Sequence, residues 1–489
     1  MVIIGSCKKE KNSNVTPTNN NNDSTEVLDT IQETGGAAEP IAELNSTPEL
    51  VLAYVSSFPT NKVLDMPPAK SQGGQGSCGA WATVYYLHSY LKHQAENTNY
   101  YLPNGKDNNA VLMSPSYTFN QMKKGDCDGG SGAIVHLSYM KNQGVCSLDD
   151  MPYTSPSCAL QPNAAQRAAA ANNKISQYFK INRHNENLMK TLINLEMPIV
   201  MAIKADQALH NLDASNVWIP NGISPGGHMV TMCGYSAQGY TFINSWGKKW
   251  GNDGKFYIPY NEYNKFPKDG GFVAFWASNP ALDNLNNNKV SEYLLNGNAQ
   301  NSSTGTNGTP NNVSGGNNRK GNSNSAVVLN GTNSYIDINE NFAANFSVSL
   351  WFNKTSGSNK QTIFSQVNQQ NDANKNIEVY IEDDSLVIDL PSDGKRFLLK
   401  TDTTLSNASW YHLVFTFDGK FLRFYLNGKA IKFAVYMNYF KNMNTSATIG
   451  CTLANSSGTK SNFFNGKIDD IKIYSRSIKE TEVDKLFLE

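Results

Sequence analysis

Cys78 lies among glycines at the predicted start of a helix, a setting in which a cysteine can act as a nucleophile. Apolar residues follow it at helical spacing, which predicts a helix from residue 78 with Ser77 as its N-cap. The N-terminus of a helix favours the thiolate, which is the nucleophilic form of cysteine. The alternative is a structural cysteine, and an isolated Gly-Ser-Cys would favour that interpretation.

A histidine and an asparagine farther along the chain supply the groups that such a nucleophile needs. His228 opens an apolar strand predicted over residues 228–235, and Asn244 ends the next predicted strand. An imidazole can take the thiol proton and return it to a leaving amine, while a carboxamide can fix the orientation of the ring. Trp246 would cover the bond between them and exclude water, or would be an ordinary core aromatic like Trp250.

Three segments around these residues resemble the papain family of cysteine peptidases. They read QGGQGSCGAW from Gln72, PGGHMVTMCGY around His228 and NSWGKKWG from Asn244, and the last is the most specific match. The resemblance implies Cys78 as nucleophile, His228 as general base and Asn244 as the group that orients the imidazole. It also implies that the amide of Gln72 stabilises the tetrahedral oxyanion, although Gln72 alone would be an ordinary loop residue. Catalysis of this kind needs no cofactor.

A fourth segment, CDGG from Cys127, resembles the part of the family that binds the substrate backbone like an added strand. The resemblance puts Gly129 and Gly130 beside the P2 residue of a substrate. The full set of residues expected at the substrate is Gly129, Gly130, Gly227 and Trp246. A disulfide between Cys127 and Cys158 is also expected, with Cys146 as the competing partner.

The resemblance has departures. Gly79 follows the nucleophile where the family often has Trp, and Gln75 occupies a position that is Cys in many relatives. A low-complexity segment precedes the domain in place of the family's long inhibitory propeptide. The other six histidines are expected to be structural or solvated: His88, His93, His136, His184, His210 and His412.

From Val290 onward the pattern changes to short strands with turn signals, which predicts a β-sandwich. The segment FSVSLWF alternates apolar and polar residues, as a half-buried strand should, and Asn427-Gly428 predicts a hairpin turn. These segments resemble the bacterial laminin-G-like domains of the concanavalin-like jelly-roll class. The resemblance implies a module that binds a glycan or a protein. Asn298 and Asp470 could ligate a structural calcium ion, with solvated turn residues as the alternative.

The first residues, MVIIGSC, resemble a bacterial lipobox, in which cleavage before Cys7 exposes that cysteine for lipid attachment. The alternative is a disordered cytosolic N-terminus with a lone cysteine. We therefore expect an extracytoplasmic protein that is lipid-anchored to a bacterial membrane, at the outer membrane or cell surface, or secreted. The expected divisions are a truncated lipoprotein signal and disordered Asn-rich tether (1–47), a papain-like domain (48–278), a linker (279–289) and a laminin-G-like domain (290–489).

The charge balance narrows the classes of function. Lys+Arg and Asp+Glu both count 41, and the net charge of +0 predicts no nucleic-acid partner. We expect an α+β papain-like peptidase domain followed by an all-β concanavalin-like sandwich. The chain should be a cysteine endopeptidase that hydrolyses protein or peptide substrates through a Cys78 thioester, targeted by its C-terminal module. The alternatives are a transpeptidase or amidase acting on cell-wall peptides and a catalytically inactive surface adhesin.

Overall fold

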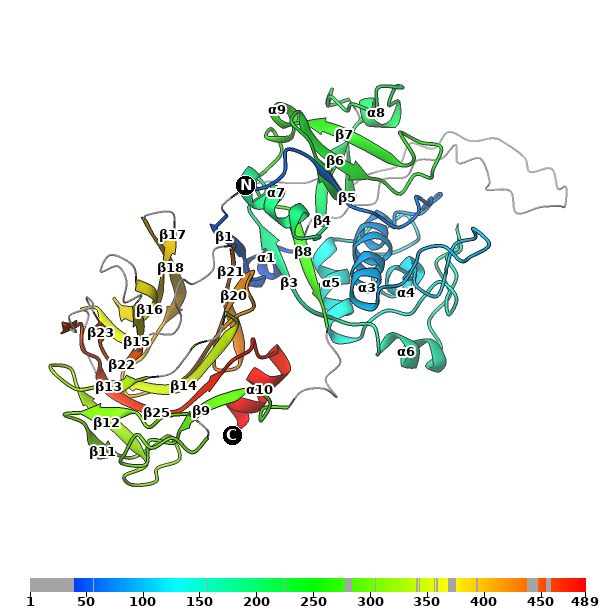
Figure 1. Cartoon of the computed structure of the whole chain (residues 1–489). Helices are drawn as coiled ribbons and strands as arrows, with labels where there is room; N and C mark the ends of the chain where they lie inside the picture. The colour runs from blue at the N-terminus through cyan, green and yellow to red at the C-terminus, as the bar shows by residue number, and fades with distance from the viewer. Residues whose placement is uncertain are drawn as a thin grey trace, which may run out of the picture. The chain divides into compact units, whose positions relative to one another are not determined.

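The computed structural model of the chain divides into two compact units (Figure 1). Unit 1 holds the described residues up to Glu49 together with Phe58–Ser278, and unit 2 holds Leu50–Ser57 and Asn279–Glu489. The structure describes residues 39–489 except 56, 156, 224, 278–283, 304, 340, 341, 343, 356, 358, 368–374, 393, 394, 438–446 and 454–458. Within that part of the chain, no helix has the length and apolar character that crossing a bilayer requires.

Unit 1 combines short helices with one antiparallel sheet, whose strand order is β3-β8-β4-β5-β6-β7, with β2 paired to β5 (Figure 1). Its strands are β2 (Lys62–Val63), β3 (Ile175–Ile181), β4 (Ile199–Ala205), β5 (Gly226–Tyr235), β6 (Gly239–Ile243), β7 (Lys255–Pro259) and β8 (Gly271–Trp276). Its helices are α1 (Ile41–Ser46), α2 (Cys78–Ala80), η1 (Trp81–His88), α3 (Ser89–Glu96), α4 (Pro115–Met122), α5 (Ala133–Asn142), α6 (Ala164–Ala170), α7 (Glu186–Asn194), α8 (Gln207–His210) and α9 (Tyr260–Tyr263).

A helical segment runs from Cys78 through α2, η1 and α3, and its central part η1 is a π-helix. All eight residues of η1 are buried, because this part of the helix packs against β4 and β5 while α4 and α5 cover it from other sides. Two hydrogen bonds fix the helix to the sheet. Thr231 Oγ1 donates to Ala82 O at 3.1 Å, and Tyr86 Oη donates to Asn244 O at 2.7 Å. The predicted helix therefore lies at the centre of unit 1, where its η1 part is fully buried.

Unit 2 is a sandwich of two sheets whose apolar side chains form one core. The first sheet has the order β1-β21-β20-β19-β14-β25-β12-β11, with β9 also paired to β25, and the second has the order β10-β13-β22-β15-β16-β17-β18. The strands of the first sheet are β1 (Leu50–Tyr54), β9 (Lys289–Tyr293), β11 (Ser314–Gly316), β12 (Ala326–Asn330), β14 (Phe346–Lys354), β19 (Trp410–Phe417), β20 (Phe421–Leu426), β21 (Lys429–Tyr436) and β25 (Asn465–Tyr474).

The second sheet consists of β10 (Thr309–Asn311), β13 (Tyr335–Ile338), β15 (Gln361–Val367), β16 (Lys375–Glu382), β17 (Ser385–Ser392), β18 (Lys395–Thr404) and β22 (Ala447–Ile449). A small pair, β23 (Thr452–Leu453) with β24 (Lys460–Ser461), and helix α10 (Glu480–Leu488) complete unit 2. The predicted turn at Asn427-Gly428 joins β20 to β21, and both of its residues have positive φ, at 51° and 77°. A type I′ hairpin requires that conformation.

Strand β14 differs from its predicted half-buried pattern, because all nine of its residues are buried. The serines that alternate with its apolar residues have partners on the outer face. Ser347 Oγ donates to Arg476 O at 2.7 Å, and Ser349 Oγ lies 2.9 Å from His412 Nε2. The C-terminal segment with α10 covers this face, since the ring of Phe487 stacks on Trp351 at 5.8 Å. An alternating pattern cannot reveal such a cover.

The chain leaves unit 1 after Glu49, contributes β1 to unit 2 and returns to unit 1 at Phe58. Leu50–Tyr54 pairs in parallel with β21 at the edge of the first sheet. These residues are predicted to belong to the peptidase domain, but the apolar run LVLAY suits any open sheet edge. The predicted linker 279–289 also differs at its end, because β9 begins at Lys289.

The predicted tether, residues 1–47, lies mostly outside the described residues, as does Cys7. Its last part is structured instead of disordered. Ile41–Ser46 forms helix α1, and the carboxylate of Glu39 accepts hydrogen bonds from the backbone of α5. Tertiary contacts with the rest of unit 1 therefore order a segment whose composition alone predicts disorder.

Candidate active site

Cys78 is buried and is the first residue of α2, so its side chain lies where the helix dipole favours negative charge. Helix α2 packs against β5, and Cys78 belongs to the same core cluster as Met229, the residue after His228. Ser77 occupies the predicted N-cap position but does not cap the helix with its side chain. Its hydroxyl lies 2.8 Å from the hydroxyl of Tyr153, which ties the nucleophile segment to a neighbouring loop.

His228 and Asn244 form the polar pair beside this helix. His228 is in β5, which pairs with β6, and Asn244 directly follows β6, so the two antiparallel strands bring the side chains together. The distance from His228 Nε2 to Asn244 Oδ1 is 2.8 Å. Since Oδ1 only accepts, Nε2 must carry the hydrogen and Nδ1 keeps its lone pair. Nδ1 is buried and has no hydrogen-bond partner among the described residues.

Trp246 lies over this pair. Its indole stacks on the imidazole of His228 with ring centroids 4.8 Å apart and an interplanar angle of 26°. The same indole stacks on His210 at 4.7 Å and 19°. His210 is expected to be structural or solvated, whereas the structure puts it next to the candidate site. No local signal marks it, because its position depends on how the loop after β4 folds.

A buried carboxylate positions His210. Asp206 is the N-cap of α8, and His210 is the last residue of that helix. Asp206 Oδ1 accepts hydrogen bonds from Leu209 N at 3.2 Å and from Trp218 Nε1 at 2.9 Å. Asp206 Oδ2 accepts from Asn221 N at 2.6 Å and from Gly222 N at 2.8 Å. Four donors from residues 209–222 thus bind the one carboxylate of Asp206, and these bonds hold α8 in place.

The electrostatics of the site keep His228 neutral. Burial lowers the pKa of His228 to about 4, the hydrogen bond to Asn244 opposes that shift, and repulsion from His210 adds to it. The pKa of His210 is also lowered by burial, while the charge of Asp206 raises it. A neutral imidazole with an unprotonated Nδ1 is the form that can accept a thiol proton.

Gln72 is held in position from both ends of its side chain. Its Oε1 accepts from Ser245 Oγ at 2.6 Å, and its Nε2 donates to Gln75 O at 2.7 Å. The backbone N–H of Gln72 donates to Ser245 O at 2.9 Å. These bonds tie the segment before Cys78 to the residue after Asn244. An amide that is fixed in this way is preorganised for a role as donor.

Gly129 and Gly130 lie in the loop before α5, against the nucleophile segment. A Cβ on Gly76 would lie 2.8 Å from Asp128 O and 3.1 Å from Gly130 N. A Cβ on Gly129 would collide with Lys124 O, and Gly130 has a φ of 61°. Both positions therefore require glycine. Gly227, the fourth residue expected at the substrate, precedes His228 in β5 and is half-buried.

A disulfide joins Cys127 to Cys158 with a Cα–Cα distance of 5.6 Å. It ties the loop that carries Gly129 and Gly130 to the segment after Tyr153. Cys146, the competing partner in the sequence analysis, is a buried thiol in the core cluster instead.

Residues 57–268 match the model of the family described as papain family cysteine protease, and residues 330–484 match the model described as the concanavalin A-like lectin/glucanases superfamily. Residues 57–268 therefore form a papain-like cysteine peptidase domain. Cathepsin K of Mus musculus is 27% identical over 224 residues, which are 45% of this chain and 64% of the relative.

Two solved structures are also similar to parts of this chain. Xylellain, a cysteine protease from Xylella fastidiosa, matches 52% of this chain and 100% of its own, with a TM-score of 0.42 and 18% identity. Domain 4 of AbnA, an extracellular arabinanase from Geobacillus stearothermophilus, matches 40% of this chain and 97% of its own, with a TM-score of 0.34 and 20% identity.

In the papain-like domain, other side chains fill the space beside Gly79, the residue that departs from the family pattern after the nucleophile. A Cβ on Gly79 would lie 2.7 Å from Ser131 O and 3.4 Å from Cδ2 of His136. His136 is buried, and its Nε2 lies 2.6 Å from Ser131 Oγ. The histidine and serine side chains therefore fill the space beside residue 79 and support the loop that contains Gly130.

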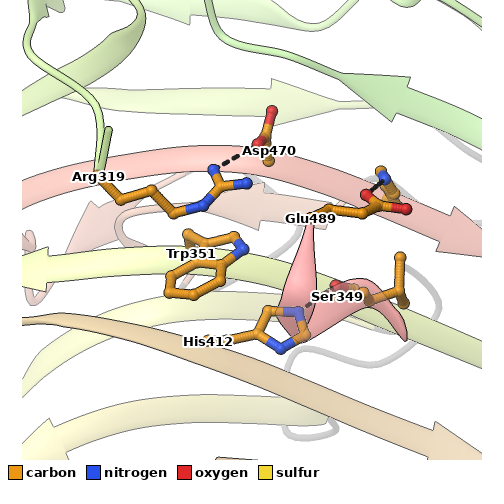
Figure 2. Close-up of a pocket in the computed structure, with 8 residues that line it drawn as sticks. Arg319, Ser349, Trp351, His412, Asp470 and Glu489 are labelled. Carbon is orange, nitrogen blue, oxygen red and sulfur yellow. Dashed lines mark hydrogen bonds and ion pairs between the residues drawn. The ribbon is translucent and has the colours of Figure 1, made fainter. Parts of the chain in front are cut away.

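A small pocket lies on the outer face of the first sheet of unit 2 (Figure 2). Trp351 lies at its centre, with Arg319 above the ring at 4.5 Å and His412 stacked below it at 4.9 Å (Figure 2). Both faces of the indole are thus covered by side chains. A sugar ring could stack there only by displacing one of them, so this cavity does not have the open aromatic platform of a glycan site.

The residues expected to ligate calcium do not fit that role. The carboxylate of Asp470 forms an ion pair with Arg319, which also contacts Asp469 at 3.1 Å. Asn298 Oδ1 accepts from Gln300 N at 2.9 Å within its own turn. Among the described residues, no group of three or more His, Cys, Asp or Glu side chains could hold a metal ion. A guanidinium therefore balances the charge of Asp470, and we assign no role to calcium.

Proposed function

We propose that unit 1 is an endopeptidase that hydrolyses peptide bonds through a thioester on Cys78. One observation carries the proposal: the Nε2–H of His228 is held by Asn244 at 2.8 Å, which leaves the Nδ1 lone pair for the thiol proton. His228 would take that proton as Cys78 Sγ attacks the carbonyl carbon of the scissile bond. The amide of Gln72 and the backbone N–H of Cys78 would stabilise the resulting oxyanion.

The rest of the cycle follows from the same groups. As the C–N bond breaks, Nδ1 of His228 gives its proton to the leaving amine and an acyl thioester remains on Cys78. Water then attacks the thioester and passes a proton to Nδ1. The C–S bond breaks, and the thiol recovers that proton. Asn244 and Trp246 would keep the imidazole in one orientation through both halves.

Casein hydrolysis tests this proposal directly. The purified chain should cleave casein, and a thiol-alkylating epoxide should abolish the cleavage. Cys78→Ala should do the same, whereas Cys233→Ala, which removes a buried thiol of β5, should leave it. Undiminished turnover by Cys78→Ala would exclude the mechanism.

Two other functions of the same site are separable from hydrolysis. A transpeptidase or cell-wall amidase would pass the acyl group to an added amine, and mass spectrometry of the products with glycine amide present would detect that transfer. An inactive adhesin would leave Cys78 unlabelled by an epoxide probe. The defined His228–Asn244 pair and the fixed amide of Gln72 favour catalysis over a dead scaffold.

We further propose that unit 2 is a carbohydrate- or protein-binding module that targets the peptidase. The match of residues 330–484 to a lectin and glucanase superfamily supports this role. The lipobox resemblance of MVIIGSC supports a lipid anchor on Cys7 and an extracytoplasmic location. A glycan array probed with the full Cys78→Ala chain tests the first proposal, and metabolic labelling with an alkyne fatty acid, with Cys7→Ser as control, tests the second.

A further inference from the structure

We propose that residues 39–47 form an intramolecular strap, with the Glu39 carboxylate as its latch, that restricts the non-primed side of the substrate cleft. The proposal rests on the proposed function, because it takes Gly129 and Gly130 as the place where the P2 residue of a substrate binds. The strap consists of Glu39, Pro40, helix α1 and Thr47.

The loop that the strap contacts is the wall next to the nucleophile. A Cβ on Gly79 would lie 2.7 Å from Ser131 O, so the loop touches the residue after Cys78. Gly132 follows and is the N-cap of α5. One residue, Ser131, therefore separates the P2-binding Gly130 from Gly132. A P2 side chain that extends along this wall comes to the N-terminus of α5.

Glu39 occupies that N-terminus. Its Oε1 accepts from the backbone N–H of Ala133, and both of its oxygens lie 3.2 Å from the N of Ile134. A Cβ on Gly132 would lie 2.5 Å from Oε2 of Glu39, so the carboxylate fills the space where a side chain at residue 132 would be. First-turn N–H groups have no partner inside their own helix, and a carboxylate there also complements the helix dipole.

The remainder of the strap is held at a few points. Leu44 is the half-buried residue of α1 and packs on the core cluster that contains Cys78, Ala133 and Met229. Leu44 O accepts from Lys180 Nζ at 2.8 Å. None of the six residues of α1 is fully buried, and Pro40 provides no side-chain cap. Apart from Glu39 and the buried Thr47, the strap buries little surface, and such an element opens at low cost, as a lid must.

The burial of the Glu39 carboxylate and the charges around it weaken its attachment to α5, so that the strap can open and close. Burial raises the pKa of Glu39 to about 7, Glu43 raises it further, and hydrogen bonds to Ile134 and Ala133 oppose the shift. Desolvation thus offsets part of what these bonds contribute. The other charged or titratable neighbours are Lys124, which lies after α4, and Tyr178 of β3.

The strap should discriminate between reagents that reach Cys78 with and without a P2 residue. Iodoacetamide carries no such residue and does not need the strap to move. A peptidyl epoxide with leucine at P2 would have to displace the latch. The reagents are compared on the full chain as wild type, Glu39→Ala, Glu39→Gln and Glu43→Gln. Glu43 is the control carboxylate, because it lies on helix α1 of the same strap and is exposed.

We expect Glu39→Ala to raise the inactivation rate by the epoxide, and kcat/KM for a peptide with leucine at P2, by at least threefold. Its rate with iodoacetamide should stay unchanged, and Glu39→Gln should lie between. Glu43→Gln should be no faster than wild type, because loss of the Glu43 charge favours the carboxylate form of Glu39. Unchanged or lower epoxide rates in Glu39→Ala would overturn the strap. A merely structural role for Glu39 predicts that second result, because loss of a helix N-terminal partner would weaken the wall.

Amide hydrogen exchange measures how often the contact between Glu39 and α5 opens, and it does not depend on catalysis. The N–H groups of Ala133 and Ile134 should exchange faster in Glu39→Ala than in wild type, and binding of the epoxide to wild type should have the same effect. Equal exchange in the two proteins would overturn the proposal even if Cys78 proved unreactive. Absence of iodoacetamide labelling in every variant would instead count against the proposed function, while the exchange result would still decide the strap.

Discussion

The Nε2 atom of His228 lies 2.8 Å from Oδ1 of Asn244, so the orientation of one imidazole depends on one carboxamide. Asn244 Oδ1 is itself fixed by the backbone N–H of Ser245 at 2.8 Å. The backbone carbonyl of Asn244 accepts from Tyr86 Oη on the central helix. The hydrogen-bond chain thus runs from the helix that begins with Cys78 to the base that would activate it.

Loss of the orienting carboxamide should reduce turnover more than binding. Asn244→Ala removes the hydrogen bond that fixes the imidazole of His228, and misplacement of a catalytic group by about 1 Å costs on the order of 10² in rate. We therefore expect kcat on a peptide substrate to fall about 10²-fold, with KM little changed. Asn264→Ala, at an exposed position after α9, is the control. A wild-type kcat for Asn244→Ala would show that the imidazole is positioned by other groups.

Gln72 should act on the transition state. Removal of one oxyanion donor lowers the rate by about 10²–10³-fold, so Gln72→Ala should lower kcat by that factor. Gln75→Ala is a demanding control, because Gln75 is equally buried and its Nε2 donates to Thr154 O at 2.7 Å. That variant should lower the melting temperature while it keeps kcat within about tenfold of wild type. Equal kcat losses in the two variants would assign Gln72 a structural role only.

Substitutions of His210 and Trp246 test separately the effect of the His210 charge and the effect of the stacked rings on His228. His210→Phe keeps a flat ring against the indole but removes the positive charge that lowers the pKa of His228. The pKa of His228, followed by NMR in the Cys78→Ala background, should rise in this variant. Activity at pH 7 should persist, whereas Trp246→Ala should lose it because water reaches the His228–Asn244 bond. An unchanged pKa in His210→Phe would mean that the two imidazoles are electrostatically independent.

Buried histidines should make unit 1 sensitive to acid. Burial lowers the pKa of His88 and His136 to about 3 and that of His228 to about 4. In the unfolded chain these groups titrate near 6.5, so between that pH and 3 the unfolded state binds more protons. The free energy of unfolding should therefore fall as the pH decreases from about 6.5 to 3.

His88→Leu tests this pH dependence. Both ring nitrogens of His88 are buried with no hydrogen-bond partner among the described residues, so leucine should replace it without breaking a bond. Thermal unfolding of the Cys78→Ala chain at several pH values would show a smaller loss at low pH in the double variant. The same slope with and without His88 would contradict the assignment.

The sequence predicted the elements whose residues carry their own local signal. Cys78, His228 and Asn244 lie in motifs with specific neighbours, and the strand from 228 and the hairpin at Asn427-Gly428 follow from apolar runs and turn chemistry. The unpredicted parts depend on contacts between distant segments. Leu50–Tyr54 joins a sheet whose partner strand β21 lies far along the chain. Glu39 is ordered only because α5 offers it two N–H groups, and His210 reaches Trp246 only because Asp206 closes a loop.

The most direct test of the account is to trap the acyl-enzyme and locate it. A slowly deacylating peptide ester would be mixed with the full chain, quenched in acid and digested for mass spectrometry. The acyl mass should appear on the peptide that contains Cys78 in wild type and be absent in His228→Ala. An acyl group on another residue, or equal acylation of Cys78 without His228, would contradict a thiol activated by the imidazole that Asn244 holds.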